Sequence, residues 1–189
     1  MSEVYESGRY VGEYLLFHFG SAEEILPWPG GPAEALDFPV RTVGHFSKGR
    51  VKRALDVGCA VGRSTLEMSR SADEVIGIDF SKAFVATAEK VRKGERVRYE
   101  RLEEAGEVAS LEVRIPEGVS PGKVGFEVGD AMGLREDLGA FDRVHAANLV
   151  CRLPEPRRFL SRLSALVKPG GELVLATPCT WLEEFTSKE

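Results

Sequence analysis

A short apolar strand that runs into a glycine-punctuated loop constrains the fold of this chain more than any other feature. Residues 54–65 read ALDVGCAVGRST, and a second apolar run at 74–79 reads EVIGID and ends in a carboxylate. That carboxylate, Asp79, lies about 20 residues beyond Gly58, the separation at which an acidic side chain reaches the ribose of a bound nucleoside. The pattern predicts a nucleoside-cofactor site at the carboxyl ends of parallel strands.

The spacing of the glycines narrows the class of cofactor. The dinucleotide fingerprint needs glycines at relative positions 1, 3 and 6, where this loop has Gly58, Ala60 and Arg63. A nicotinamide dehydrogenase is therefore disfavoured. The spacing Asp-x-Gly-x-x-x-Gly, from Asp56 to Gly62, resembles instead motif I of class I S-adenosylmethionine (SAM) methyltransferases. The alternative is a tight strand-to-helix turn without a ligand, and the second acidic strand end argues against it.

This resemblance implies a set of cofactor contacts. The glycines let the backbone approach a ligand, the loop lies beside the methionine part of the cofactor, and Asp56 bears on its amino-acid end, directly or through water. Asp79 takes the ribose hydroxyls and Phe80 packs against adenine. The Asp130 carboxylate accepts a hydrogen bond from the adenine amino group; the alternative is that Gly129-Asp130 is only a turn. The expected cofactor-binding residues are Asp56, Gly58, Cys59, Ala60, Gly62, Asp79, Phe80, Asp130, Ala131 and Asn148.

The composition suits one folded domain and excludes several classes. The chain has 189 residues, 29% of them charged, with a net charge of -5 and no long basic run, so we expect no nucleic-acid partner. No apolar run approaches the roughly 18 residues of a membrane span, and the amino terminus lacks a signal-peptide pattern. We expect no membrane contact and a cytoplasmic location. Three widely spaced cysteines without a CxxC pair predict no disulfide framework and no metal site.

Strands and helices alternate along most of the chain, which is typical of a parallel sheet wrapped by helices. The predicted strands are 51–57, 74–79, 123–128, 141–147 and 172–177, and the predicted helices are 8–19, 63–70, 81–92 with Ser81 as N-cap, and 156–167. A hairpin inserted at about 96–115 interrupts the alternation. The sequence therefore predicts an α/β, Rossmann-like class I methyltransferase fold with a mostly parallel sheet flanked by helices.

Two regions are expected along the chain. Residues 1–50 form a helical lead-in whose predicted helix, 8–19, carries aromatic side chains on much of its surface, so it is expected to be a substrate lid. Residues 51–189 form the SAM-binding core. Class I methyltransferases normally add two strands after the fifth, so the apolar strand at 172–177 would be an open edge. We expect either a fragment that lacks those strands or a homo-oligomer that covers the edge.

Several segments resemble a narrower family, the 4-mercaptohistidine N1-methyltransferases, which are the methyltransferase domain of ovothiol biosynthesis. They are 14–20, 26–28, 38–41, 56–64, 77–81, 129–131, 146–149 and 180–186. The resemblance spans nearly the whole chain and implies SAM-dependent methylation of an imidazole nitrogen of 5-thiohistidine, with a sulfur-inserting synthase as a partner. The alternatives are a methyltransferase of another small molecule and a catalytically silent SAM-binding module.

A thiohistidine substrate asks for three kinds of side chain. Its carboxylate favours an arginine, its ring favours an aromatic or amide wall, and its ring proton needs an acceptor such as histidine. The arginine candidates are Arg9, Arg41 and Arg152. The wall candidates are Tyr14, Phe17, Trp28, Asn148 and Trp181, and the proton acceptors are His18 and His45. We expect Tyr14, His18 and Asn148 to serve catalysis, whereas His145, inside a strand, is expected to be structural.

Overall fold

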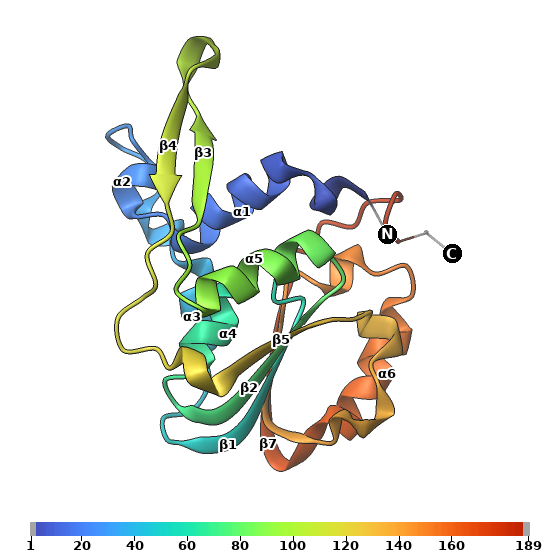
Figure 1. The fold of residues 1–189 in the computed structure, drawn as a ribbon. Helices are drawn as coiled ribbons and strands as arrows, with labels where there is room; N and C mark the ends of the chain where they lie inside the picture. The colour runs from blue at the N-terminus through green and yellow to red at the C-terminus, as the bar shows by residue number, and fades with distance from the viewer. Residues whose placement is uncertain (1–2, 187–189) are drawn as a thin grey trace.

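Five parallel strands form the central sheet (Figure 1). The computed structural model describes residues 3–186. The strands are β1 (Val51–Val57), β2 (Ala72–Asp79), β5 (Val124–Val128), β6 (Phe141–Ala147) and β7 (Val167–Ala176). Their order across the sheet is β5-β2-β1-β6-β7, and every neighbouring pair is parallel. This order reverses at β1, which places a topological switch point between β1 and β6. The predicted Rossmann-like α/β fold is confirmed.

Helices cover both faces of the sheet (Figure 1). One face carries α1 (Gly8–Phe19), α3 (Phe38–Val43), α4 (Arg63–Met68) and α5 (Lys82–Arg92), and the other carries α6 (Pro156–Leu166). Each face of the sheet has its own buried apolar core. Since successive strand residues point to opposite faces, Ala54 lies in the core on the α1, α3, α4 and α5 side, whereas Leu55 and Val57 lie in the core on the α6 side. With both faces buried, the strands read as nearly continuous apolar runs.

Short elements connect these layers. They are α2 (Ala22–Ile25) and the 3-10 helices η1 (Glu3–Glu6), η2 (Ala33–Ala35), η3 (Glu104–Gly106), η4 (Pro121–Lys123), η5 (Ala131–Gly133), η6 (Glu136–Leu138) and η7 (Val150–Arg152). Side-chain caps fix where two longer helices begin. Ser7 Oγ accepts from the backbone N–H of Tyr10 at the start of α1, and Ser81 Oγ accepts from that of Phe84 at the start of α5. The predicted Ser81 cap is confirmed.

The predicted insertion is an antiparallel hairpin that stands apart from the central sheet (Figure 1). Its strands are β3 (Arg98–Leu102) and β4 (Val108–Glu112). Helix α1 packs against β3 at Gly12, where an added Cβ would lie at the ordinary contact distance of 3.5 Å from the carbonyl oxygen of Glu100.

The fifth sheet strand differs from the prediction at its start. The sequence predicts a helix to residue 167 and a strand from residue 172, because the intervening Lys168-Pro-Gly-Gly is a helix stop signal. In the structure α6 ends at Leu166, and β7 begins at Val167. The pairing with β6 shifts from Phe141–Val167 to Arg143–Glu172, so the proline and glycines lie in a bulge inside the strand. A bulge accommodates residues that a regular ladder excludes.

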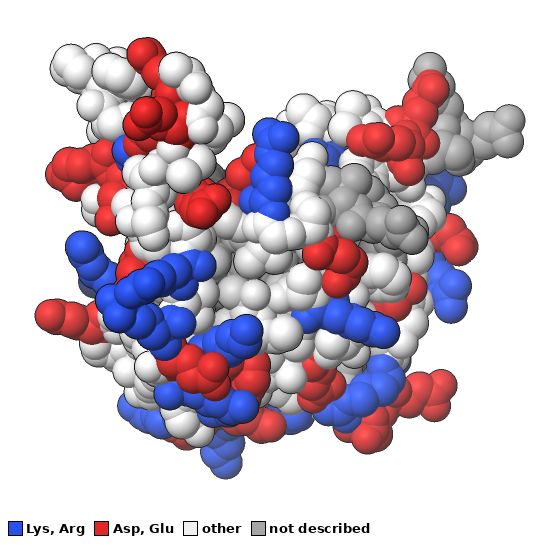
Figure 2. Space-filling view, turned by 45° about the horizontal axis from the view of Figure 1, so that its top comes forward, with Lys and Arg blue, Asp and Glu red and all other residues white. Residues whose placement is uncertain are grey.

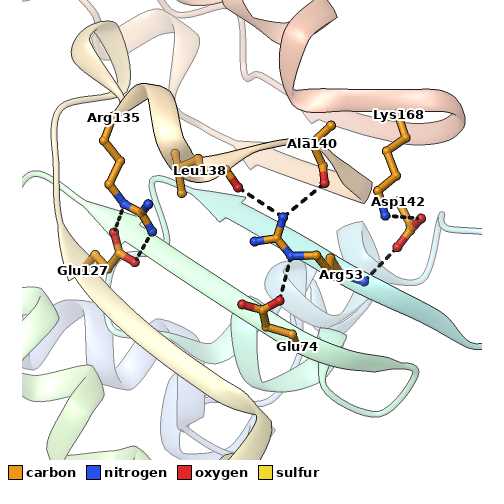
Figure 3. A network of polar contacts seen from close by, with 8 residues as sticks. All are labelled: Arg53, Glu74, Glu127, Arg135, Leu138, Ala140, Asp142 and Lys168. Atoms are coloured by element: carbon orange, nitrogen blue, oxygen red, sulfur yellow. Dashed lines mark hydrogen bonds and ion pairs between the residues drawn. The ribbon is translucent and has the colours of Figure 1, made fainter.

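A polar network at the amino-end side of the sheet holds the strands in register (Figure 3). The Arg53 guanidinium of β1 donates to Glu74 of β2 at 2.7 Å and to the carbonyl oxygens of Leu138 and Ala140. Asp142 of β6 accepts from the Arg53 backbone N–H and from Lys168. The network leaves the opposite, carboxyl ends of the strands free to form a site.

Candidate cofactor and acceptor site

A cleft of about 290 Å³ lies at the carboxyl ends of β1, β2 and β6. Three groups of residues line it. The strand ends contribute Val57, Gly58, Ile78, Asp79, His145, Ala147 and Asn148; the amino-terminal region contributes Tyr5, Glu13, Tyr14, Phe17, His18, Phe38 and Pro39; later loops contribute Arg152, Leu153 and Phe185. Charges of both signs are interspersed on the face seen in Figure 2 around a largely uncharged middle. The setting is the one in which open α/β sheets bind ligands.

The loop after β1 is fixed to the end of β2. Gly58 has a φ of 78°, where glycine is favoured, and its N–H donates to the carbonyl oxygen of Ile78 at 2.8 Å. The N–H of Ala60, also in the left-handed region with a φ of 47°, donates to Asp79 Oδ2 at 2.8 Å. The N–H of Ser81 donates to the other Asp79 oxygen at 2.9 Å. The sequence pattern is thus also a structural unit that presents the Asp79 carboxylate to the cleft.

The Asp79 carboxyl group is nearly buried. Burial raises its pKa above the ordinary value, while the N–H groups of Ser81 and Ala60 oppose that shift. Each bonded oxygen keeps a second lone pair that can accept from a ligand hydroxyl. The residues present therefore fit the ribose of an adenosyl cofactor.

Gly62, predicted to bind the cofactor, is required instead by its backbone conformation and by packing. It begins α4 with a φ of 89°, and an added Cβ would lie 2.5 Å from Cζ of Phe126. Gly62 does not line the cleft, so packing of α4 against β5 demands this glycine. Cys59 is likewise fully buried outside the lining, and burial raises the pKa of its thiol well above the ordinary value.

Asp56 lies beneath the cleft rather than on its wall. Its Oδ2 accepts from the hydroxyls of Ser64 and Thr65, both at 2.6 Å, and its Oδ1 lies 2.8 Å from His145 Nδ1. Burial raises the pKa of Asp56, but the His145 ring and the two hydroxyls outweigh it and hold the pKa below its usual value. Asp56 thereby orients Ser64 and His145, which do line the cleft.

The side expected to hold adenine has small and aromatic walls. Phe80, 48% exposed, lies beside Asp79, and Gly129 and Ala131 line the cleft near it. Asp130 is not among the lining residues. Its Oδ1 accepts from the Met132 N–H at 2.9 Å and caps η5, which is the turn role that the sequence left open.

Another part of the cleft wall is aromatic and comes from α1. Tyr14 packs against Phe84 with ring centroids 4.6 Å apart, and burial raises its pKa above the ordinary value. His18 presents a buried Nδ1 that has no hydrogen-bond partner among the described residues. Burial, with a smaller contribution from Arg63 and against the effect of Asp56, lowers the pKa of His18 to about 4. His18 is therefore a neutral imidazole whose buried Nδ1 makes no hydrogen bond within the described part of the chain.

Arg152 is a basic side chain in the cleft lining, and it joins two ends of the chain. Its Nη1 donates to the carbonyl oxygen of Thr180 at 3.0 Å, and its guanidinium lies 5.1 Å from the centre of the Phe185 ring. It also interacts with Tyr5, whose pKa is raised by burial against the opposing effect of Arg152. Asn148, with a φ of 55°, lies beside it in the lining.

The structure leaves other predicted residues outside the cleft. Arg41 donates to the carbonyl oxygens of Glu34 and Leu36, so it fastens a loop. Trp28 is more than half-exposed, Trp181 is half-exposed, and His45 is exposed. Arg9 pairs with Glu13 on the surface. The other predicted residues outside the cleft are thus Arg9, Trp28, Arg41, His45 and Trp181. None of these five residues lies at a strand end: Arg9 is on α1, Arg41 is on α3, and the other three are in connecting segments.

Sequence reasoning missed several lining residues. They are Tyr5, Glu13, Phe38, Ser64, Phe84, Phe185 and His145, the last predicted to be only structural. Phe38 and Phe185 belong to segments already quoted for the narrower resemblance, so that signal was available for them. Within residues 3–186, no group of three or more His, Cys, Asp or Glu is placed to hold a metal ion. No helix of the described chain is long and apolar enough to cross a membrane.

The fold and the site define a Rossmann-like domain of the class I SAM methyltransferase type. A family model described as a methyltransferase domain matches residues 32–187. The chain therefore belongs to this family of methyltransferase domains.

Individual relatives agree with this assignment. The chain is 31% identical to a ubiquinone biosynthesis O-methyltransferase of Alkalilimnicola ehrlichii, over 75% of this chain and 47% of that protein. It is 30% identical to the O-methyltransferase cnsE of Penicillium expansum, over 88% of this chain and 51% of that protein. The chain thus spans about half the length of the curated relatives it matches.

Solved structures share the fold. The [4+2]-cyclase SpnF superposes with a TM-score of 0.55 and 28% identity, over 77% of this chain and 46% of that chain. Phosphoethanolamine N-methyltransferase 1 of Haemonchus contortus superposes with a TM-score of 0.58 and 18% identity, over 100% of this chain and 36% of that chain. The second likeness concerns the fold alone.

Proposed function

We propose that the protein transfers the methyl group of SAM to an imidazole ring nitrogen of 5-thiohistidine, as in ovothiol biosynthesis. The observation that carries the proposal is the free Nδ1 of His18 inside an aromatic wall. The narrower family resemblance of the sequence supplies the identity of the acceptor. A sulfur-inserting synthase partner and a cytoplasmic location remain predictions of the sequence.

Two sides of the cleft would divide the work. The Asp79 carboxylate and Phe80 would hold the nucleoside of SAM, which supplies a methyl group on a sulfonium ion. Tyr14, Phe17 and Asn148 would hold the flat acceptor ring, and the 1–50 lead-in would act as the lid that excludes water. Arg152 is the arginine that the cleft offers to the substrate carboxylate, and its guanidinium fork matches two oxygens.

The chemistry asks little of the protein beyond orientation. Bound SAM would supply an electrophilic methyl carbon and a neutral thioether leaving group. The acceptor ring nitrogen would supply the electron pair for the new bond and would lose its proton. His18 Nδ1 has no hydrogen-bond partner among residues 3–186, so in the tautomer whose proton is on Nε2 its lone pair would take that proton. Holding the reactants in line can supply about 7–11 kcal/mol of the barrier.

An oxygen acceptor is the second candidate, because the relatives at 30–31% identity are named O-methyltransferases. His18 would take the proton of a hydroxyl in the same way. A catalytically silent SAM-binding module is the third, and it predicts binding without turnover.

Mass spectrometry of 5-thiohistidine incubated with SAM and the protein tests the proposal. A product heavier by one methyl group, lost in His18→Phe, is expected. A phenolic acceptor in a parallel reaction separates the second candidate. Methylation of the phenol alone would overturn the thiohistidine assignment, and bound SAM without any product would favour the silent module.

A further inference from the structure

A buried chain of hydrogen bonds runs from the cofactor loop to helix α3. Asp56 of β1 and His145 of β6 are register partners in the sheet, so their side chains lie on the same face. His145 Nδ1 lies 2.8 Å from Asp56 Oδ1, and Nε2 lies 3.0 Å from Thr42 Oγ1. The three residues are between 1% and 5% exposed. The histidine therefore bridges β1 and α3, through Asp56 and Thr42.

The α3 end of this chain reaches the cleft wall. Thr42 Oγ1 lies 3.0 Å from the carbonyl oxygen of Phe38 and 3.1 Å from that of Pro39. Phe38 and Pro39 line the cleft, and the Phe38 ring lies 6.2 Å from that of Phe17. The hydroxyl of Thr42 thus sits between the His145 ring and the backbone that carries this wall.

The other end reaches the helix that follows the glycine loop. Asp56 Oδ2 accepts from Ser64 and Thr65 in the first turn of α4, and Ser64 lines the cleft. Arg63, in the same turn, donates to the carbonyl oxygen of His18 at 3.0 Å. The start of α4 is consequently tied both to α1 and, through His145, to α3.

We propose that His145 is a positioning residue that couples SAM binding at the 58–64 loop to the placement of the Phe38–Pro39 wall. A buried polar group that loses its partner costs more than the bond itself contributes, so members of this network shift together rather than separately. A histidine is needed because both ring nitrogens bond, whereas an apolar residue would leave the Asp56 charge without a buried partner. The inference holds for any methyl acceptor.

Hydrogen-exchange mass spectrometry of the full chain, with and without SAM, tests the coupling. In the wild type, SAM should slow exchange by about threefold or more in residues 56–66 and also in 38–44. Thr42→Val keeps the side-chain shape and removes the hydroxyl, so it should keep the protection of 56–66 and lose that of 38–44. Thr42→Ser restores the hydroxyl and should restore both.

A second variant guards against misfolding. His145→Asn keeps an amide donor toward Asp56 and removes the contact to Thr42, so it should behave as Thr42→Val does. Calorimetric SAM affinity should stay within about threefold of wild type in both variants. Retained protection of 38–44 in both variants, its absence in the wild type, or loss of SAM binding in both would each overturn the coupling.

Discussion

Asp79 is the single residue on which the cofactor site most depends. Its two oxygens are each held by a backbone N–H, so the carboxylate is oriented before SAM arrives. Asp79→Ala should weaken SAM binding by at least about 1 kcal/mol, or roughly fivefold in Kd, as for a lost bond to a charged group. Calorimetric titration measures this. Asp73→Ala, at the other end of β2 where Asp73 pairs with Arg50, is the matched control. An unchanged Kd in Asp79→Ala would contradict the ribose role.

His18 predicts how stability depends on pH. Its pKa is lowered in the folded state from 6.5 to about 4, so between these values the unfolded chain binds a proton that the folded chain refuses. The contribution of His18 to the free energy of unfolding is therefore greatest above the unfolded pKa of 6.5, and it falls as the pH drops toward 4. Between pH 7 and pH 5 the loss should be about 1–2 kcal/mol.

Urea unfolding at both pH values checks this assignment. His18→Gln should lose less stability on acidification than the wild type, whereas His45→Gln, which removes an exposed histidine, should follow the wild type. If His18→Gln and the wild type showed the same acid sensitivity, His18 would not be buried in its neutral form.

At the scale of elements, the start of α4 depends on a glycine that packs against β5. Gly62→Ala adds a Cβ 2.5 Å from Cζ of Phe126 and forces a left-handed alanine, so it should cost about 2–4 kcal/mol. Gly94→Ala has a similar φ of 73° but open space, so it should cost only about 1 kcal/mol. Urea midpoints at constant m measure both.

A double mutant separates the packing cost from the backbone cost. Phe126→Leu removes the ring that the new Cβ would meet most closely, so Gly62→Ala should cost less in that background. Its cost should stay above that of Gly94→Ala, because the Ala88 Cβ would still lie 3.0 Å away. Equal costs for Gly62→Ala with and without the Phe126 ring would contradict the packing explanation.

Local patterns predicted most elements, because apolar runs and caps decide them. The strands at 51–57 and 141–147 and the Ser81 cap were predicted with their observed bounds. The start of β7 was not, because Pro169 and Gly170 favour a helix stop and only the pairing with β6 reveals the bulge. Element type thus follows from sequence more readily than strand register does.

The site divides in the same way. Asp79 was placed by spacing along two strands, which the sheet converts directly into position. Arg41 and Trp181 were chosen by side-chain type alone. Arg41, on α3, is held by carbonyl oxygens of the segment before that helix, and neither residue lines the cleft. His145 was predicted to be structural, because a single strand does not show that Asp56 and Thr42 meet both its nitrogens.

At the scale of the whole molecule, β7 is an edge strand with exposed apolar side chains. Among the described residues it pairs only with β6, and Leu173 and Leu175 are 41% and 37% exposed. Such an edge favours pairing with other chains. Light scattering of the purified chain should therefore detect self-association, and Leu173→Lys should reduce it while His45→Lys should not. A monomer in the wild type would contradict this prediction.

The central claim is that the cleft at the strand ends holds the adenosyl donor on the Asp79 side and the acceptor on the His18 side. A crystal structure with S-adenosylhomocysteine and the acceptor tests it most directly. We predict the ribose hydroxyls on Asp79, and the acceptor ring between Tyr14 and Asn148 within hydrogen-bond distance of His18 Nδ1. A ligand bound elsewhere, or with its ribose away from Asp79, would contradict the account.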